Sequence, residues 1–228
     1  MNNKRRDPWF PSKPNEEGGL AYIPKITRDP YRIIGTSSYD RYLDIFLKMW
    51  PDIKKAVPQA TFHCFYGWQL FDIFYKNNPE RMSWRNKVAE LLKQDGVFDH
   101  GRVPQHILKE ETLKSSIWAY CPWFGEINCI SAQKSQAYGA IPVCVNYAAL
   151  KETVKFGKII NVYDESGKQT RDIYDPEVQE EFKQALIDAL TDHKWQEKVR
   201  KEMIPYALEH FTWLKTASGW DSEFRKGV

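Results

Sequence analysis

The chain has 228 residues and a mass of 26.9 kDa, which suits one large α/β domain and leaves little room for a second. Hydrophobic residues make up 42% and charged residues 28%, so the composition excludes disordered, collagen-like and membrane classes. The formal net charge is only +3, and the basic residues are spread along the chain, so we expect no nucleic acid as a partner.

The N-terminal residues 1–30 are rich in Pro, Gly, Asn and charge and show no sustained apolar period. This composition predicts an irregular N-terminal arm. It also lacks the apolar segment of a signal peptide, and no apolar run reaches the roughly 18 residues that a membrane-spanning helix needs. We therefore expect a cytoplasmic protein without a transmembrane segment.

Strand and helix patterns alternate from Tyr31 onward. An apolar run that ends in small polar residues predicts a first strand, and apolar residues at near-helical spacing from Leu43 to Ile53 predict the helix that follows it. The same logic predicts a strand at 60–67, a helix at 82–94, a strand at 95–103 and a helix at 104–116.

The second half of the chain continues this alternation. It predicts a strand at 115–122, a helix at 126–139 that Gly139 closes, and a strand at 140–146. A charged, Gly-punctuated region then runs to about residue 172, with room for a hairpin. Two or three amphipathic helices are expected at 176–192, 195–210 and 212–226.

This order predicts one parallel sheet with helices on both faces. In such sheets ligands bind beyond the carboxyl ends of the strands, where loops lead into helix N-termini. Free N–H groups and a partial positive charge make these helix ends good phosphate sites. The predicted ligand-facing loops are Thr36 to Arg41, Tyr66 to Asp72, Gly101 to Gln105, Tyr120 to Asn128 and Asn146 to Ala149.

The stretch CPWFGEINCISAQKSQAYGAIPVCVNYAALKET resembles the signature of family-4-type GT-B glycosyltransferases, in which a Glu-containing loop opens a helix that x-P-V-V follows. RIIGTSSYDRYLDIFLKMWPDIKKAVPQATFHCFYG is similar to the first strand, helix and strand of that family's donor domain. HGRVPQHILKEETLKSSIWAY resembles its third strand, short helix and fourth strand. The resemblance implies an α/β fold: a single Rossmann-like, nucleotide-sugar-binding domain at 31–228, equivalent to the C-terminal half of a GT-B enzyme.

The resemblance also implies roles for individual residues. Glu126 matches the carboxylate that contacts hydroxyls of the donor sugar, and Arg41 matches a basic residue that reaches the diphosphate; these two are the catalytic candidates. Further donor-binding candidates are Ser37 and Ser38 beside Arg41, Gly67 after the second strand, Arg102 and Val103 at the nucleobase, and the backbone N–H groups of Ile127, Asn128, Cys129 and Ile130 at the phosphates.

Two positions depart from the family pattern. Lys134 stands where a second Glu usually binds the ribose hydroxyls, and an ammonium group cannot accept the hydrogen bonds that a diol donates. We therefore place Lys134 in the donor site with an altered role, such as an ion pair with Glu126, since their spacing of eight residues puts both on roughly the same face of the predicted helix. Tyr42 stands where the family commonly has Gly, and its bulk would narrow the loop.

Simpler interpretations stay open for these residues. Glu126 could be a carboxylate that the helix dipole favours, Arg41 and Arg102 solvated charges, and the tryptophans packing residues. The histidines His63, His100 and His106 share no metal-ligand spacing, so no metal site is predicted. The four cysteines show no C-x-x-C spacing and are expected to pack as reduced thiols.

The expected reaction is the transfer of a hexose from a nucleoside-diphosphate sugar to an acceptor, with retention of configuration and without a resident cofactor or an obligatory metal. Only about thirty residues precede the first strand, so the acceptor domain of a complete enzyme is expected from another part or partner. The aromatic C-terminal segment could support self-association.

The alternative is a non-catalytic nucleotide- or sugar-binding module, or a structural protein with the same fold. A G-x-G-x-x-G enzyme of another class is disfavoured because no such motif follows the first strand.

Overall fold

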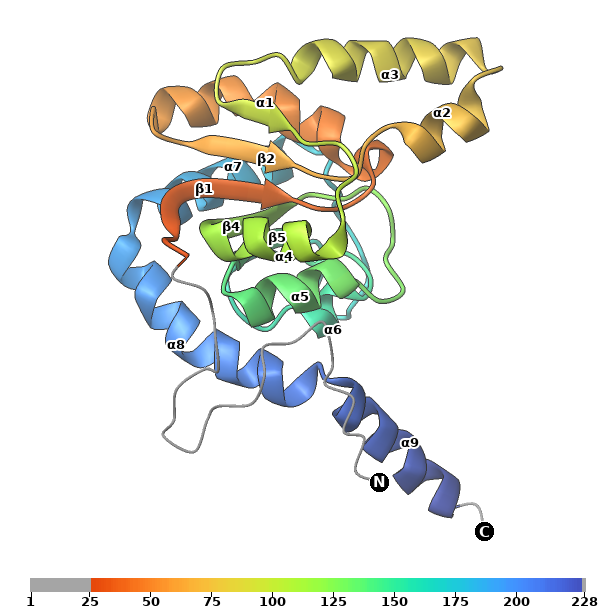
Figure 1. Cartoon of the computed structure of the whole chain (residues 1–228), viewed down its shortest axis with the longest axis vertical. Coiled ribbons are helices and arrows are strands. Elements are labelled where there is room, and N and C mark those ends of the chain that lie inside the picture. Colours follow the sequence, from red (N-terminus) through yellow and green to blue (C-terminus); the bar gives the residue numbers. More distant parts are fainter. Residues whose placement is uncertain (1–25, 227–228) are drawn as a thin grey trace.

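The structure of the chain is a computed structural model that describes residues 26–226 (Figure 1). Most of the predicted N-terminal arm lies outside the described residues. Within them, no helix combines the length and the apolar character needed to cross a lipid bilayer. The strands are β1 (Asp29–Gly35), β2 (Thr61–Cys64), β3 (Val97–Asp99), β4 (Ser115–Tyr120), β5 (Ile141–Val145) and β6 (Lys158–Ile160). The helices are a 3-10 turn η1 (Tyr39–Arg41), α1 (Leu43–Ala56), α2 (Gln69–Tyr75), α3 (Pro79–Leu91), α4 (Gln105–Lys114), α5 (Ile130–Tyr138), α6 (Leu150–Thr153), α7 (Pro176–Thr191), α8 (His193–His210) and α9 (Trp213–Lys226).

The strands form a six-stranded sheet in the order β3-β2-β1-β4-β5-β6, and every neighbouring pair is parallel. Strands β4 and β5 are buried along their whole length, as expected for the centre of a sheet that is covered on both faces. The predicted α/β Rossmann-like fold is therefore confirmed. The strand order reverses between β1 and β4, and in sheets of this topology the crevice at such a point binds ligands.

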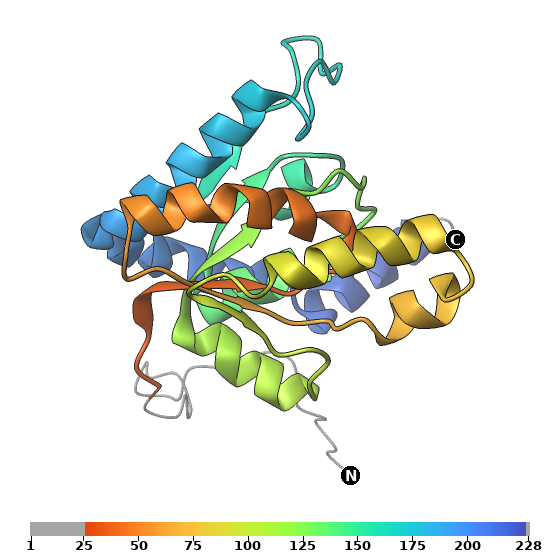
Figure 2. The ribbon, with the colours of Figure 1, turned by 90° about the horizontal axis from the view of Figure 1, so that it is seen from above.

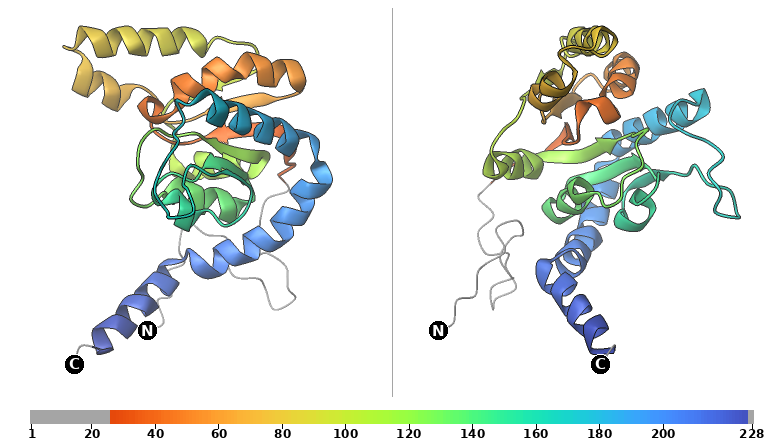
Figure 3. Two further views of the ribbon diagram at one scale, coloured as in Figure 1. Left: turned by 180° about the vertical axis from the view of Figure 1, so that it is seen from behind. Right: turned by 90° about the vertical axis from the view of Figure 1, so that its right-hand side faces the viewer.

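Helices cover both faces of the sheet (Figure 3). Helices α1 and α7 pack against each other and α7 lies on β1, β4, β5 and β6, while α4 and α5 pack against each other on the opposite face. Helix α8 lies against α5 and β5. Between α1 and β2, the ring of Phe46 lies 4.2 Å from that of Phe62, and both side chains are fully buried together with Trp50.

The helix expected at 126–139 is shorter than predicted, because α5 begins at Ile130. Glu126 lies in the loop before it, where its backbone carbonyl accepts a hydrogen bond from the N–H of Ala149 at 3.1 Å. This hydrogen bond to the loop after β5 holds the Glu126 backbone outside the helix. The predicted end is confirmed, since Gly139 closes α5 with a φ of 80°, a conformation that glycine adopts without a steric penalty.

Three further elements, α2, α6 and β6, were not predicted. Helix α2 lies inside and beyond the segment expected as a loop, and α2 and α3 project together from the body of the molecule (Figure 2). Strand β6 and the short α6 lie in the charged region, where the antiparallel bridge between Tyr163 and Gln169 closes the expected hairpin. All three elements are short, so none contains enough residues to show a period in the sequence.

The last helix, α9, confirms the prediction for 212–226 but has no buried residues. It extends away from the sheet beyond the end of α8 (Figures 1 and 3). Its large apolar side chains Trp213, Leu214, Trp220 and Phe224 are each at least 60% exposed.

Candidate functional site

The loops that follow β1 and β4 meet at the carboxyl-end edge of the sheet. They bring Arg41, at the end of η1, to Glu126, which is 85 residues away in the sequence. Arg41 Nη1 donates to Glu126 Oε1 at 2.9 Å, and the hydroxyl of Tyr120, the last residue of β4, donates to the same oxygen at 2.6 Å. We call Arg41, Glu126 and Tyr120 the edge cluster.

The edge cluster is partly shielded from water. The Glu126 side chain is 10% exposed and that of Arg41 34%. Partial burial alone would lower the pKa of Arg41, but the Glu126 carboxylate and the Tyr120 hydroxyl raise it above its ordinary value. Burial and the hydrogen bond to Glu126 raise the pKa of Tyr120 far above the usual tyrosine range, so its hydroxyl stays protonated and remains a donor. Both donors bind Oε1, so Oε2 of Glu126 is left without a partner from the described residues.

The backbone around Arg41 is fixed by the loop after β4. Trp123 donates its backbone N–H to the Arg41 carbonyl at 3.1 Å and its indole N–H to the Asp40 carbonyl at 2.7 Å. The ring of Phe124 lies 4.3 Å from the Arg41 guanidinium carbon, a cation–π arrangement. These contacts join the loop after β1 to the loop after β4 and fix the Arg41 backbone beside Glu126.

The N-terminus of α5 follows directly after the edge cluster. Cys129 is the N-cap residue, and its side chain makes no capping hydrogen bond. The side chain of Asn128 accepts from the α5 residue Gln133 at 2.9 Å, while Ile127 is 95% exposed. The first N–H groups of a helix have no partner within the helix, so the start of α5 can offer them to an anion.

A pocket of about 210 Å³ lies between α4 and α5, over β4 and beside the loops that follow β1, β2 and β3. Thr36 and Trp118 belong to its lining, and the indole N–H of Trp118 donates to the Thr36 hydroxyl at 3.2 Å. The ring of Trp118 also lies 5.2 Å from that of Tyr120, which joins the pocket to the edge cluster through β4. The pocket and the edge cluster are thus neighbours, although no residue of the edge cluster lines the pocket.

The structure divides the sequence-predicted residues between these two parts. Arg41 and Glu126 form the edge cluster, whereas Arg102, Val103, Ile130 and Lys134 line the pocket. The expected ion pair between Lys134 and Glu126 is wrong: Glu126 is occupied by Arg41, and Lys134 Nζ lies 3.4 Å from Gln105 Oε1. The ion pair was expected because both residues were placed on one helix, but Glu126 precedes α5.

The remaining candidates support the loops. Ser37 is 7% exposed, and the hydroxyl of Ser38 donates to Asp40 at 2.6 Å; that these hydroxyls donate to a bound ligand stays a prediction. Gly67 has a φ of 79°, and a Cβ there would lie 3.0 Å from the Arg102 backbone nitrogen. Glycine at this position therefore allows the loops after β2 and β3 to approach each other.

Several pocket residues were missed in the sequence. Gln105, Lys109 and Thr112 line the pocket from α4, and their spacing places them on one helical face. The spacing was visible, but the sequence did not show which face of α4 turns toward the pocket. Among residues 26–226, no group of three His, Cys, Asp or Glu side chains is arranged to hold a metal ion, and the four cysteines are free and buried.

No known family model matches the sequence, and no curated protein matches it. Solved structures do match. The GtfA/B complex is 14% identical, with a TM-score of 0.65 over 89% of this chain and 37% of that chain. HepE from Anabaena, in complex with UDP and glucose, is 11% identical, with a TM-score of 0.62 over 87% of this chain and 48% of that chain. The α,α-trehalose 6-phosphate synthase from Burkholderia multivorans is 12% identical, with a TM-score of 0.58 over 88% and 43%.

At these identities the likeness establishes the fold. The chain has the fold of one half of a GT-B glycosyltransferase, and it spans less than half the length of these solved chains. The resemblance found in the sequence is confirmed at this level.

Proposed function

We propose that the chain binds a nucleoside-diphosphate sugar at the carboxyl-end edge of its sheet and forms the donor half of a retaining glycosyltransferase. A hexose would pass from this donor to an acceptor held by a second domain or a partner chain. The observation that carries the proposal is the Arg41–Glu126 pair next to the open start of α5, at the point where the strand order reverses.

Each part of the edge cluster has a chemical role in this proposal. The N–H groups at the start of α5 and the Arg41 guanidinium would bind the diphosphate and stabilise the charge that develops on it as the sugar leaves. Glu126 Oε2 has no partner from the described residues, so it can accept a hydrogen bond from a sugar hydroxyl. The Tyr120 hydroxyl, which donates to Glu126 Oε1, would hold the carboxylate in position. Fixed positions of these groups reduce the entropy that the reaction must lose.

The solved structures support the choice of ligand. HepE was solved with UDP-glucose, and the pneumococcal O-GlcNAc transferase GtfA, with a TM-score of 0.54, was solved with UDP and GlcNAc. UDP-hexoses are therefore the first donors to test, with GDP-hexoses and ADP-hexoses beside them.

Isothermal titration calorimetry with UDP, GDP, ADP and their hexose conjugates tests the proposal directly. We expect one conjugate to bind more tightly than its bare nucleotide, because Glu126 adds contacts to the sugar. Glu126→Gln should weaken binding of the conjugate by about tenfold and that of the bare nucleotide much less. Glu209→Gln, at an exposed position on α8, is the matched control and should leave both affinities unchanged. If no conjugate binds at millimolar concentration, the donor site does not exist.

Lys134 favours a second candidate, a module that binds the nucleotide without transferring the sugar, because a carboxylate for the ribose is missing. Release of nucleoside diphosphate from the bound donor separates the two functions. Slow release that Arg41→Gln abolishes supports transfer chemistry. Tight binding without release in the presence of water and simple sugar acceptors supports the binding module.

A further inference from the structure

The last helix, α9, carries an apolar stripe along one face. Trp213, Ala217, Trp220 and Phe224 follow one another at intervals of four, three and four residues. At about 100° per residue, this spacing places the four side chains within about 60° of one another around the helix axis. We call these four residues the α9 stripe. No residue of α9 is buried, so the described part of the molecule leaves the stripe open.

The exposed area of the α9 stripe is large for a chain that stays single. Its three aromatic residues are 60–67% exposed, and the rings of Trp220 and Phe224 lie 5.5 Å apart. Aromatic side chains of this size have areas of about 150–250 Å², so the three together expose roughly 300–500 Å². Apolar patches of that size on a monomer are often interaction sites.

The charges on α9 do not favour a lipid surface as the occupant. The helix carries three basic and two acidic residues, so its net charge is only +1. Both carboxylates form ion pairs within the helix: Asp221 lies 2.8 Å from Arg225, and Glu223 lies 2.6 Å from Lys226. A helix that binds an anionic membrane has a strongly basic polar face instead.

A second copy of α9 fits the stripe when the two helices run in opposite directions. About a two-fold axis midway between Ala217 and Trp220, the small Ala217 of each copy meets the large Trp220 of the other. Trp213 of each copy then meets Phe224 of the other at the two ends. A parallel pair would place alanine on alanine and tryptophan on tryptophan, which leaves a gap next to an overfilled layer.

The position of α9 also favours the antiparallel arrangement. The helix extends away from the sheet beyond the end of α8 (Figures 1 and 3). Its 14 residues span about 21 Å, so an antiparallel pair holds the two sheets at opposite ends of the paired helices. In a parallel pair both α8 helices would lie at the same end and crowd each other.

We propose that α9 is a dimerisation helix, through which two copies of the chain pair about a two-fold axis with their α9 helices antiparallel. This inference goes beyond the proposed function and does not depend on it. The apolar area of the stripe is smaller than the roughly 800 Å² that each partner buries in a standard interface. The dimer should therefore be weak, with a dissociation constant of about 1–100 μM.

Sedimentation velocity of the full chain over a concentration series tests the proposal. The mass should rise from 26.9 kDa toward twice that value as the concentration passes the dissociation constant. Ala217→Glu places a charge opposite Trp220 of the second copy and should weaken the dimer by at least about tenfold. Ser222→Glu adds the same charge to the opposite face of α9 and is the matched control, which should leave the dimer unchanged.

Two results of this experiment overturn the proposal. One is a chain that stays monomeric at every concentration, and the other is an equal effect of the two substitutions. Because α9 has no buried residues, neither substitution should unfold the sheet, and circular dichroism spectra of both variants check that the fold is intact.

Disulfide formation tests the direction of the pairing. Thr216 and Glu223 lie along one edge of the stripe, and the two-fold axis brings Thr216 of one copy beside Glu223 of the other. A mixture of Thr216→Cys and Glu223→Cys chains should therefore form mixed disulfides, whereas either chain alone should form few. The four native cysteines are buried and add little background. If the mixture forms no more disulfide than the separate chains, the antiparallel pairing is wrong.

Vesicles of anionic phospholipid test the competing occupant. We expect no co-sedimentation that depends on the α9 stripe, because the helix lacks a basic face. Co-sedimentation that Ala217→Glu abolishes and Ser222→Glu preserves would assign the stripe to a lipid surface and overturn the proposal.

Discussion

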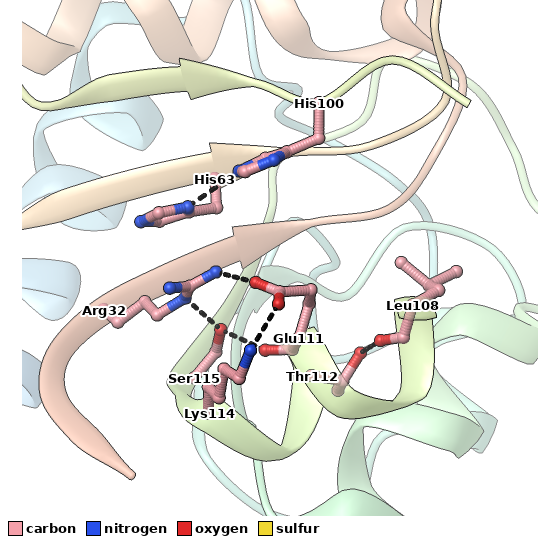
Figure 4. Close-up of polar contacts among 8 residues, drawn as sticks. All are labelled: Arg32, His63, His100, Leu108, Glu111, Thr112, Lys114 and Ser115. Carbon is pink, nitrogen blue, oxygen red and sulfur yellow. Dashed lines mark hydrogen bonds and ion pairs between the residues drawn. The ribbon is translucent and has the colours of Figure 1, made fainter. Parts of the chain in front are cut away.

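Two of the Arg–Glu pairs among the described residues lie in polar clusters of different character. One is the edge cluster, where Arg41 meets Glu126 beyond the strand ends. The other joins Arg32 of β1 to Glu111 of α4 on one face of the sheet, with His63 and His100 close by (Figure 4). We call it the sheet-face cluster.

The sheet-face cluster is closed. Arg32 also donates to the Ser115 hydroxyl at 3.2 Å, and the second oxygen of Glu111 accepts from Lys114 at 2.7 Å. Both oxygens of Glu111 are therefore bound by the protein, whereas Oε2 of Glu126 is not bound by the described residues. An Arg–Glu pair thus supports the fold where it lies in the middle of β1, at Arg32 and Glu111. It forms a candidate binding site where it lies beyond the strand ends, at Arg41 and Glu126.

Glu111→Ala should produce the largest effect on stability. The side chains of Arg32 and Glu111 are each 15% exposed, so the substitution leaves a largely buried guanidinium without its carboxylate. Loss of one partner of a buried pair costs about 3 kcal/mol of the free energy of unfolding. Urea denaturation measures this loss, and Glu110→Ala, at an exposed position, should change it by less than about 0.5 kcal/mol. If Glu111→Ala also lost less than about 0.5 kcal/mol, the sheet-face cluster would not support the fold.

The sheet-face cluster should also make stability depend on pH. Burial, together with the nearby charges of Arg32 and His100, lowers the pKa of His63 to about 3. The unfolded chain has an ordinary histidine pKa near 6.5, so it binds the proton first as the pH falls. His63 therefore contributes stability that is complete above about pH 6.5 and is lost as the pH falls toward 3.

Denaturation at pH 7.5 and pH 5 tests this dependence. The unsubstituted protein should lose about 1–2 kcal/mol more between these pH values than His63→Gln, since one proton changes stability by about 1.4 kcal/mol per pH unit. His106→Gln, on the exposed start of α4, should keep the full pH dependence. Equal pH dependence in all three proteins would show that His63 is not held neutral by the fold.

Tyr120→Phe tests the edge cluster. The hydroxyl donates to the Glu126 carboxylate, and hydrogen bonds to charged groups contribute about 1.5 kcal/mol or more. We expect that loss in the free energy of unfolding, and weaker binding of the sugar conjugate because Glu126 is no longer fixed. Tyr42→Phe is a sharp control: the Tyr42 ring lies 5.2 Å from that of Tyr120, but its buried hydroxyl has no hydrogen-bond partner. Removal of that hydroxyl should leave stability unchanged or raise it.

Much of the fold was predictable from the sequence because long amphipathic helices and buried strands repeat their pattern over many residues. The five strands nearest the N-terminus and the end of α5 at Gly139 belong to this group. Short elements such as α2 and β6 were not predictable. Their form depends on tertiary contacts rather than on a local period.

The candidate site was predictable only in part. The resemblance placed Glu126 and Arg41 together, and the structure brings them to 2.9 Å. Their direct pairing was not visible, because the start of the helix was assigned four residues too early and Lys134 was taken as the partner. The sheet-face cluster was missed, since it depends on the parallel register that places Ile34 beside His63 and on the face that α4 turns toward β1.

Phe124→Leu should have the smallest effect. It tests the cation–π contact between Phe124 and Arg41 in the edge cluster. The ring lies 4.3 Å from the Arg41 guanidinium carbon and is 38% exposed, a setting in which cation–π contacts contribute about 0.5–1 kcal/mol. A double-mutant cycle with Arg41→Gln isolates this contact from the area that Leu fails to bury. The coupling should be about 0.5 kcal/mol without ligand. It should fall when a diphosphate binds, because the phosphate then holds Arg41 in place of the ring. A coupling of zero in both states would mean that the ring only covers the loop and does not orient Arg41.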